Sequence, residues 1–104
     1  MSHLQLSRTR PIPEAWQDLT DEQNDAQSAA IYAVIGEHGG DVKVVSFSPS
    51  QIALTSVIEY PDEQSAKLSA AGIVALGTIE FISIETLWDV VEWVGMLRAA
   101  NTKA

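Results

Sequence analysis

The chain of 104 residues contains no cysteine. Disulfide bonds, thiolate metal sites and thiol nucleophiles are therefore excluded, and a reducing cytoplasm is the expected compartment. Basic residues are scarce: six lysines and arginines stand against fourteen acidic residues, which gives a net charge of −8. Because phosphate binding requires clustered cations, we expect neither nucleic acid nor an anionic membrane as a partner. The basic residues are scattered: Arg8, Arg10, Lys43, Lys67, Arg98 and Lys103.

Long apolar runs are missing as well. The run AAGIVALG is far shorter than the ~20 residues that cross a bilayer, and the N-terminal MSHLQLSRTR lacks the continuous apolar segment of a secretory signal. With 46% hydrophobic and 19% charged residues, the composition is that of a globular protein. We expect a soluble, acidic cytoplasmic protein with a single domain spanning 1–104.

The apolar runs and helix signals predict the order β-α-β-β-α-β, followed by a C-terminal helix. A capping box from Thr20 to Gln23 opens the first helix, which ends at Gly39. Asp62 and Gly77 are placed to cap and end the second helix. The remaining segments are strands at 3–9, 42–48, 52–60 and 78–85, a proline-containing connector without regular structure at 10–19, and a last helix at 87–100.

This order is typical of the ferredoxin-like split-βαβ fold, an α+β fold in which two helices cover one face of a four-stranded antiparallel sheet. Successive strand residues point to opposite faces of the sheet. If Leu4 and Leu6 pack under the helices, polar residues line the uncovered face. Those residues are His3, Gln5, Ser7 and Thr9.

The other strands are apolar on both faces, with Val44 beside Val45 and Phe81 beside Ile82. The last helix is apolar nearly all round, and such a helix needs cover on every side. We therefore expect two sheets to pair in a homodimeric α/β barrel. The alternative is that the helix folds across the open sheet of its own monomer. The helix residues expected at the dimer interface are Trp88, Val91, Trp93, Val94 and Leu97.

The segment EYPDEQSAKLSAAGIVALGTIEFISIETL resembles the GYD domain family of the dimeric α/β-barrel superfamily. The shared pattern is a strand ending in Glu-aromatic-Pro-Asp, an alanine-rich helix ending in Ala-Leu-Gly, and a strand running to Thr-Leu. The resemblance covers most of residues 20–87 and implies a ferredoxin-like subunit that pairs sheet to sheet, but no activity. At the positions that name the family, this chain carries Ser50, Ile52 and Ala53. The residues that carry the resemblance are Glu59, Tyr60, Pro61, Asp62, Ala75, Leu76, Gly77, Thr86 and Leu87.

Four polar residues are candidates for binding a ligand inside the barrel: His3, Gln5, Ser7 and Ser56. An imidazole has its pKa near working pH and suits a general base. The competing interpretation of His3 is a side chain on a frayed terminal strand. We expect no cofactor and no metal, because the acidic segment DEQND lacks the glycine and the distant glutamate of a calcium loop.

Three functions are open at this point. Binding or assembly is favoured over catalysis, because the sequence has no G-x-S-x-G, P-loop or dinucleotide-binding motif. The alternative is a cofactor-independent enzyme of the monooxygenase or cyclase type, acting on a small organic substrate, and it rests on fold analogy alone. The third is an accessory subunit whose open face is covered by a different protein. The expected partners are a second copy of this chain and a small organic ligand.

Overall fold

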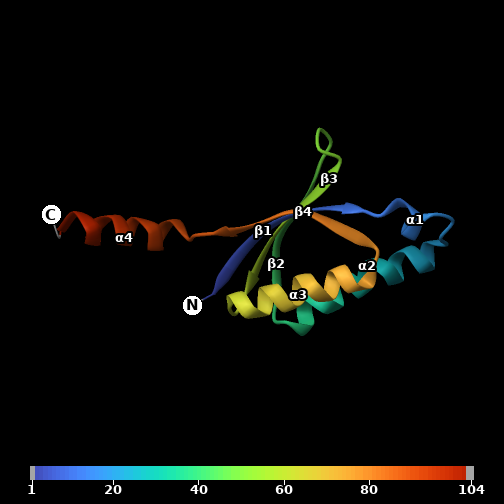
Figure 1. Ribbon diagram of the computed structural model, residues 1–104, viewed down its shortest axis with the longest axis horizontal. Helices are drawn as coiled ribbons and strands as arrows, with labels where there is room; N and C mark the ends of the chain where they lie inside the picture. The colour runs from blue at the N-terminus through green and yellow to red at the C-terminus, as the bar shows by residue number, and fades with distance from the viewer. Residues whose placement is uncertain (1, 103–104) are drawn as a thin grey trace.

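The structure is a computed structural model that describes residues 2–102, so that Lys103 lies outside the described residues. In this range it confirms the predicted ferredoxin-like α+β fold, with a four-stranded antiparallel sheet in the order β2-β3-β1-β4 (Figure 1). The elements are β1 (His3–Pro11), α1 (Pro13–Trp16), α2 (Asp21–Glu37), β2 (Asp41–Ser48), β3 (Ala53–Tyr60), α3 (Glu63–Leu76), β4 (Ile79–Leu87) and α4 (Val90–Thr102).

Helices α2 and α3 lie side by side on one face of the sheet (Figure 1). Their ends follow the expected signals. Thr20 and Gln23 form the reciprocal capping box of α2, and Gly77 ends α3 in the left-handed region at φ 73°. The Asp62 carboxylate accepts the backbone N–H of Ser65 at 2.7 Å, and this hydrogen bond lowers the pKa of Asp62. The core between helices and sheet contains Ile35, Ile58, Tyr60, Ala66, Ile73 and Ile79.

The structure settles which side of β1 faces the helices, and it is not the side of Leu4 and Leu6. Gln5, Ser7 and Thr9 point toward the helices and are only 5%, 3% and 7% exposed. Leu4 and Leu6 alternate with them and therefore lie on the opposite, uncovered face. The sequence left open which side of β1 faces the helices. The structure shows that β1 does not supply the apolar core and that neighbouring β3 contributes Ile58 and Tyr60 to it. The uncovered side of the sheet, which carries Leu4, Leu6, Arg8 and Arg10, is called the open face below.

The open face carries several ion pairs and is less apolar than expected. Lys43 lies 2.7 Å from Asp41 and 3.7 Å from Glu59, and its hydrogen bond to Asp41 is the main reason that its pKa is raised. Arg8 pairs with Glu85 at 3.3 Å. Apolar side chains lie between these pairs, including Leu6 and its register partner Val57. The open face is thus amphipathic, which is common for surfaces that meet another protein.

Two boundaries differ from the sequence-based prediction. The connector at 10–19 is not wholly irregular, because β1 extends to Pro11 and Pro13 starts the four-residue helix α1, a position where proline is tolerated. The last helix begins at Val90, not at Leu87, which is still part of β4. The Asp89 carboxylate accepts the backbone N–H of Glu92 at 3.2 Å and so caps α4.

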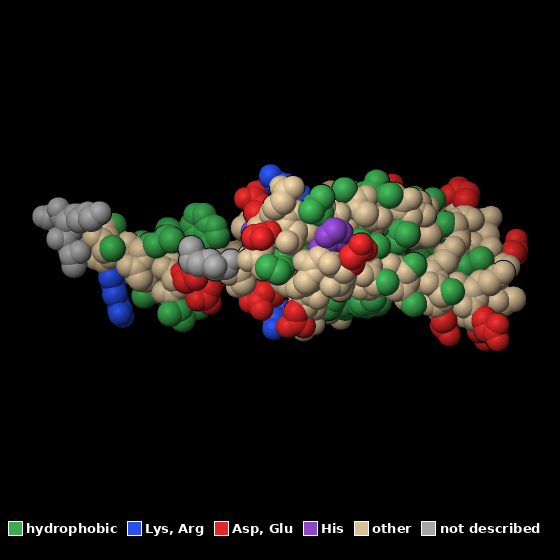
Figure 2. Space-filling view, turned by 90° about the horizontal axis from the view of Figure 1, so that it is seen from below, with side chains coloured by type: hydrophobic (Ala, Val, Ile, Leu, Met, Phe, Trp, Pro, Cys, Tyr) green, Lys and Arg blue, Asp and Glu red, His purple; other side chains and the backbone are tan. Residues whose placement is uncertain are grey.

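Helix α4 points away from the sheet and from the other helices (Figure 1). Every residue from Trp88 to Asn101 is exposed, and the molecule measures 62 × 31 × 18 Å along its principal axes. The structure therefore does not place α4 across the open sheet of its own subunit. Figure 2 shows the resulting apolar projection, with green side chains on the part that extends from the main body. Within residues 2–102, no helix is both long and apolar enough to span a membrane.

Candidate functional site

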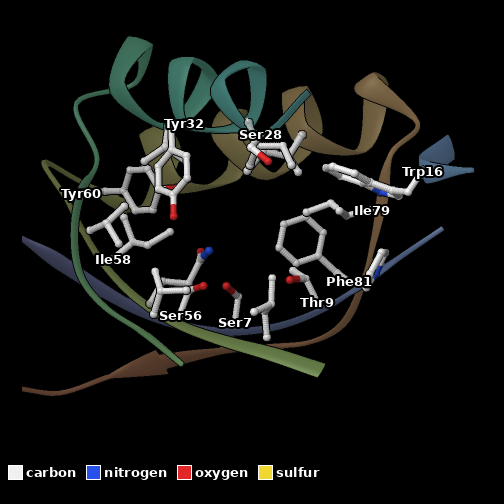
Figure 3. Close-up of a pocket in the computed structure, with 18 residues that line it drawn as sticks. Ser7, Thr9, Trp16, Ser28, Tyr32, Ser56, Ile58, Tyr60, Ile79 and Phe81 are labelled. Atoms are coloured by element: carbon white, nitrogen blue, oxygen red, sulfur yellow. The ribbon is translucent and has the colours of Figure 1, made fainter. Parts of the chain in front are cut away.

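A cavity of about 470 Å³ lies between the sheet and the helices (Figure 3). The sheet forms its floor and α2 forms its roof, while α1 and the start of β4 close one end. This volume falls within the range of about 300–1,000 Å³ that is typical of small-molecule sites. The cavity is the leading candidate for a functional site among the described residues.

Polar side chains line the floor of the cavity. Gln5, Ser7 and Thr9 occupy alternate positions on β1, and Ser56 faces Ser7 from the paired position on β3. Ser28 contributes a further hydroxyl from α2 in the roof. None of these five side chains forms a hydrogen bond with another residue of 2–102. Their polar atoms line the open space of the cavity, so this row can donate hydrogen bonds to a bound molecule and accept them from it.

Four aromatic rings form the walls. Tyr32 on α2 directs its hydroxyl toward the floor, and Phe81 on β4 stands across the cavity from it (Figure 3). Trp16 closes one end, held there because its indole N–H donates to the Thr78 carbonyl at 2.7 Å. The fourth ring, Tyr60, is at the opposite end. Flat rings around a polar floor suit a ring-containing organic molecule.

Tyr60 connects the cavity to the core. Its hydroxyl lies 2.7 Å from that of Ser69, which is fully buried in α3. Burial raises the pKa of the Tyr60 phenol, while the hydrogen bond with Ser69 acts in the opposite direction. The phenol therefore stays protonated at neutral pH and acts as a fixed wall.

Replacing Tyr60 by phenylalanine is expected to destabilise the protein by about 1–2 kcal/mol, because the buried Ser69 hydroxyl loses its partner. The double variant Tyr60→Phe/Ser69→Ala removes both hydroxyls and should recover most of this loss, since no unpaired group is left. Urea unfolding of the two single variants and the double variant measures the effect. Additive losses in the double variant would contradict a coupled pair.

The same tyrosine gives the protein an alkaline pH dependence. The unfolded phenol ionises near its ordinary pKa of about 10, whereas the folded phenol holds its proton to higher pH because its pKa is raised. The contribution of Tyr60 to the free energy of unfolding is therefore complete below pH ~10 and falls as pH rises through the folded pKa. In Tyr60→Phe, the free energy of unfolding should decrease less as the pH rises above ~10.

Three of the four predicted ligand-binding residues come together in the cavity. Gln5, Ser7 and Ser56 line its floor on the helix side of the sheet, whereas the sequence analysis placed them inside a barrel formed by two sheets. His3 lies at the start of β1 opposite Tyr60 and is not in the cavity wall. Ligand binding by these residues stays a prediction. The described part of the chain brings no three His, Asp or Glu side chains into an arrangement that could hold a metal.

Sequence reasoning missed Trp16, Tyr32, Phe81 and Thr9 as cavity residues. Strand alternation could have identified Thr9, because it shares a face of β1 with Gln5 and Ser7. Phe81 is the register partner of Thr9 and lies on the same face. Trp16 carried a weaker signal, an isolated aromatic residue in a polar, proline-containing segment. Tyr32 gave no signal, since its place on α2 is indistinguishable from that of a surface residue.

The five residues expected at a dimer interface all lie on α4 or at its start, and all are exposed. The rings of Trp88 and Trp93 contact each other with their centroids 5.4 Å apart and tilted by 40°. This pair gives the start of α4 a continuous aromatic surface. Its burial by a second subunit stays a prediction.

Comparison with known proteins supports the fold and identifies no activity. No known protein family matches the chain, and no curated protein does. The structural-genomics structure of protein YJCS is similar over 86% of this chain and 99% of that chain, with a TM-score of 0.53 and 9% identity. The crystal structure of SCO4226 from Streptomyces coelicolor A3(2) matches over 78% of this chain and 91% of that one, with a TM-score of 0.47 and 14% identity. At such identities the likeness to YJCS extends to the fold only.

Proposed function

We propose that this protein is a cytoplasmic homodimer that binds a small, uncharged organic molecule in the cavity of each subunit and does not transform it. The observation that carries the proposal is the floor of the cavity. There, Gln5, Ser7, Thr9 and Ser56 are available to hydrogen-bond a ligand because they use no partner within residues 2–102. A polar row beneath aromatic and aliphatic walls is the usual composition of a small-molecule site.

The composition of the cavity wall favours a neutral ligand. Its residues include no lysine, arginine, histidine, aspartate or glutamate. A charged ligand would lose its hydration there without gaining a counter-ion, which is unfavourable in an apolar environment. Alternate residues of β1 place polar groups about 7 Å apart. A flat molecule with oxygen or nitrogen substituents along one edge would match this spacing.

The same composition favours binding over catalysis. General acid–base chemistry needs a group that exchanges protons near neutral pH. The only ionisable side chains in the wall are the phenols of Tyr32 and Tyr60, and the pKa of Tyr60 is raised further. His3, the general base of the enzyme hypothesis, is outside the wall. These facts support a carrier or sensor of a small molecule.

Homodimerisation is the second part of the proposal. It is supported by helix α4 and the segment just before it, whose large apolar side chains Trp88, Val91 and Met96 are all more than half exposed, because large exposed apolar patches commonly mark protein–protein contact sites. The proposal includes membership of the GYD family, in which the sheets of two subunits pair into a barrel. It is supported by the Glu-Tyr-Pro-Asp and Ala-Leu-Gly patterns around α3.

Titration with 1-naphthol and with 1-naphthoate tests the ligand chemistry. Both have the same two-ring frame, but at pH 7 only 1-naphthoate is charged. We expect 1-naphthol to bind at least tenfold more tightly in isothermal titration calorimetry, because the cavity offers no cation to the carboxylate. Backbone amide NMR shifts should concentrate at β1, β3 and α2. Equal affinities, or shifts confined to α4, would contradict the proposal.

A further inference from the structure

A groove of about 540 Å³ crosses the open face where β1, β4 and the β2–β3 turn meet. Arg8 and Arg10 enter it from β1, and Gln51 from the turn. A β-bulge in β4 opposite Arg8 and Thr9 leaves Ile82 without a register partner, and this side chain lines the groove. Bulges commonly redirect a side chain in this way. The groove thus combines an apolar side chain, two guanidinium groups and the Glu85 carboxylate.

The positive charge of the groove is only partly neutralised from within. Arg8 is paired with Glu85 at 3.3 Å. Arg10 donates to the Gln51 carbonyl at 3.2 Å and forms no ion pair with any residue of 2–102. With Glu85 also in its lining, the groove holds two guanidinium groups and one carboxylate, a net positive charge in a chain of net charge −8. Its chemistry suits an occupant that is both apolar and acidic.

The start of α4 has that complementary chemistry. Trp88 is 70% exposed, and Asp89 and Glu92 give the first turn two carboxylates on the outside of the molecule. An indole ring packs favourably against a guanidinium group, and an arginine binds a carboxylate through two parallel hydrogen bonds. The apolar and acidic parts of this turn therefore match Ile82 and Arg10 in the groove.

The groove of the same subunit is out of reach for this turn. From Ile82 to Leu87, β4 runs about 17 Å away from the apolar part of the groove, and α4 then continues away from the sheet (Figure 1). In a twofold dimer whose β4 strands run antiparallel, the end of one β4 lies over the start of the other. That arrangement brings each α4 to the groove of the other subunit, and the twofold axis forms the contact twice.

We infer that the first turn of α4 docks into the Arg8–Arg10 groove of a second copy of this chain, so that the two subunits exchange their C-terminal helices. The inference rests on the homodimer proposed above and assigns its contact surface. One contact of this kind covers three features: the aromatic pair at the start of α4, Arg10, whose charge is free within the described part of the chain, and Ile82 at the β-bulge.

Charge exchange between Arg10 and Glu92 tests the contact. Arg10→Glu and Glu92→Arg should each raise the dimer dissociation constant about tenfold in sedimentation equilibrium, because each places like charges together. The double variant should return to within about threefold of the unmodified protein, since the pair is restored with its signs exchanged. Lys67→Glu, on α3 away from the groove, changes the net charge as Arg10→Glu does and should have no effect. Additive weakening in the double variant would overturn the inference.

Cysteine cross-linking tests the groove contact separately from the homodimer. Because the chain has no native cysteine, only the introduced cysteines can form disulfides. One chain carries Gln51→Cys and the other Trp88→Cys; mixed and oxidised, they should form a disulfide-linked heterodimer. The pair Lys67→Cys with Trp88→Cys should not. A dimer that cross-links equally in both mixtures, or in neither, overturns the groove contact and leaves the proposed homodimer standing. A monomer at all concentrations would overturn both.

Discussion

Replacing Trp93 by glutamate is expected to dissociate the homodimer, with a rise of about 1,000-fold in its dissociation constant. Trp93 is exposed in the subunit and contacts the ring of Trp88. Buried interface tryptophans commonly contribute about 2 kcal/mol or more, and a twofold dimer loses the contribution twice. The resulting ~4 kcal/mol corresponds to three orders of magnitude. Light scattering coupled to size exclusion at micromolar concentration would show the subunit mass.

Ala71→Glu is the matched control, because it adds the same single carboxylate to an exposed position of α3. It should leave the dimer intact. The subunit itself should stay folded in Trp93→Glu, since α4 makes no part of the core cluster. Urea unfolding and far-ultraviolet circular dichroism would show this. A Trp93→Glu protein with the mass of the unmodified one would refute the role of α4 in assembly.

The elements of the fold were predictable because their signals are local. The Thr20–Gln23 capping box and the Asp62 cap each act across three residues, and both appear with the hydrogen bonds that the sequence implies. Gly77 lies at positive φ, as a residue that ends a helix often does. Such features are set by neighbours in the chain, so a single sequence is enough to find them.

No local signal in the sequence shows which face of the sheet the helices cover. Strands β2, β3 and β4 carry apolar residues on both sides, so alternation separates two faces without saying which one the helices cover. The choice depends on the packing of α2 and α3 against Ile58 and Tyr60 of β3. The sequence of β1 alone therefore left open whether Leu4 and Leu6 or the polar residues between them face the helices.

The cavity depends on contacts between distant parts of the chain. Trp16 becomes a wall because its indole reaches the carbonyl of Thr78, 62 residues away. The side chain of Gln27 fixes α1 by donating to the Ala15 carbonyl at 3.0 Å. The four candidate residues were proposed for their polarity, and three of them share a cavity because β1 and β3 pair in register. The empty space that makes them a site is a property of the tertiary structure.

The double variant Ser7→Val/Ser56→Val is expected to weaken 1-naphthol binding about 100-fold while making the subunit more stable. Each serine offers one hydroxyl to the ligand, and each lost hydrogen bond removes about 1–1.5 kcal/mol of binding free energy, which together approach the ~2.7 kcal/mol of a 100-fold change. The methyl groups also narrow the cavity between the paired strands. Calorimetric titration measures the affinity.

The free energy of unfolding of Ser7→Val/Ser56→Val should increase although its affinity for 1-naphthol falls. A substitution that merely damaged the fold would lower both. The two hydroxyls use no hydrogen-bond partner within residues 2–102, so their replacement breaks no hydrogen bond and adds apolar contact in β-branched residues that suit strands. We expect a gain of about 1 kcal/mol in the free energy of unfolding, as functional-site substitutions often give. Thr55→Val, on the open face of the same strand, should leave 1-naphthol affinity unchanged. Weaker binding together with lower stability would mean that the serines support the fold and not a ligand.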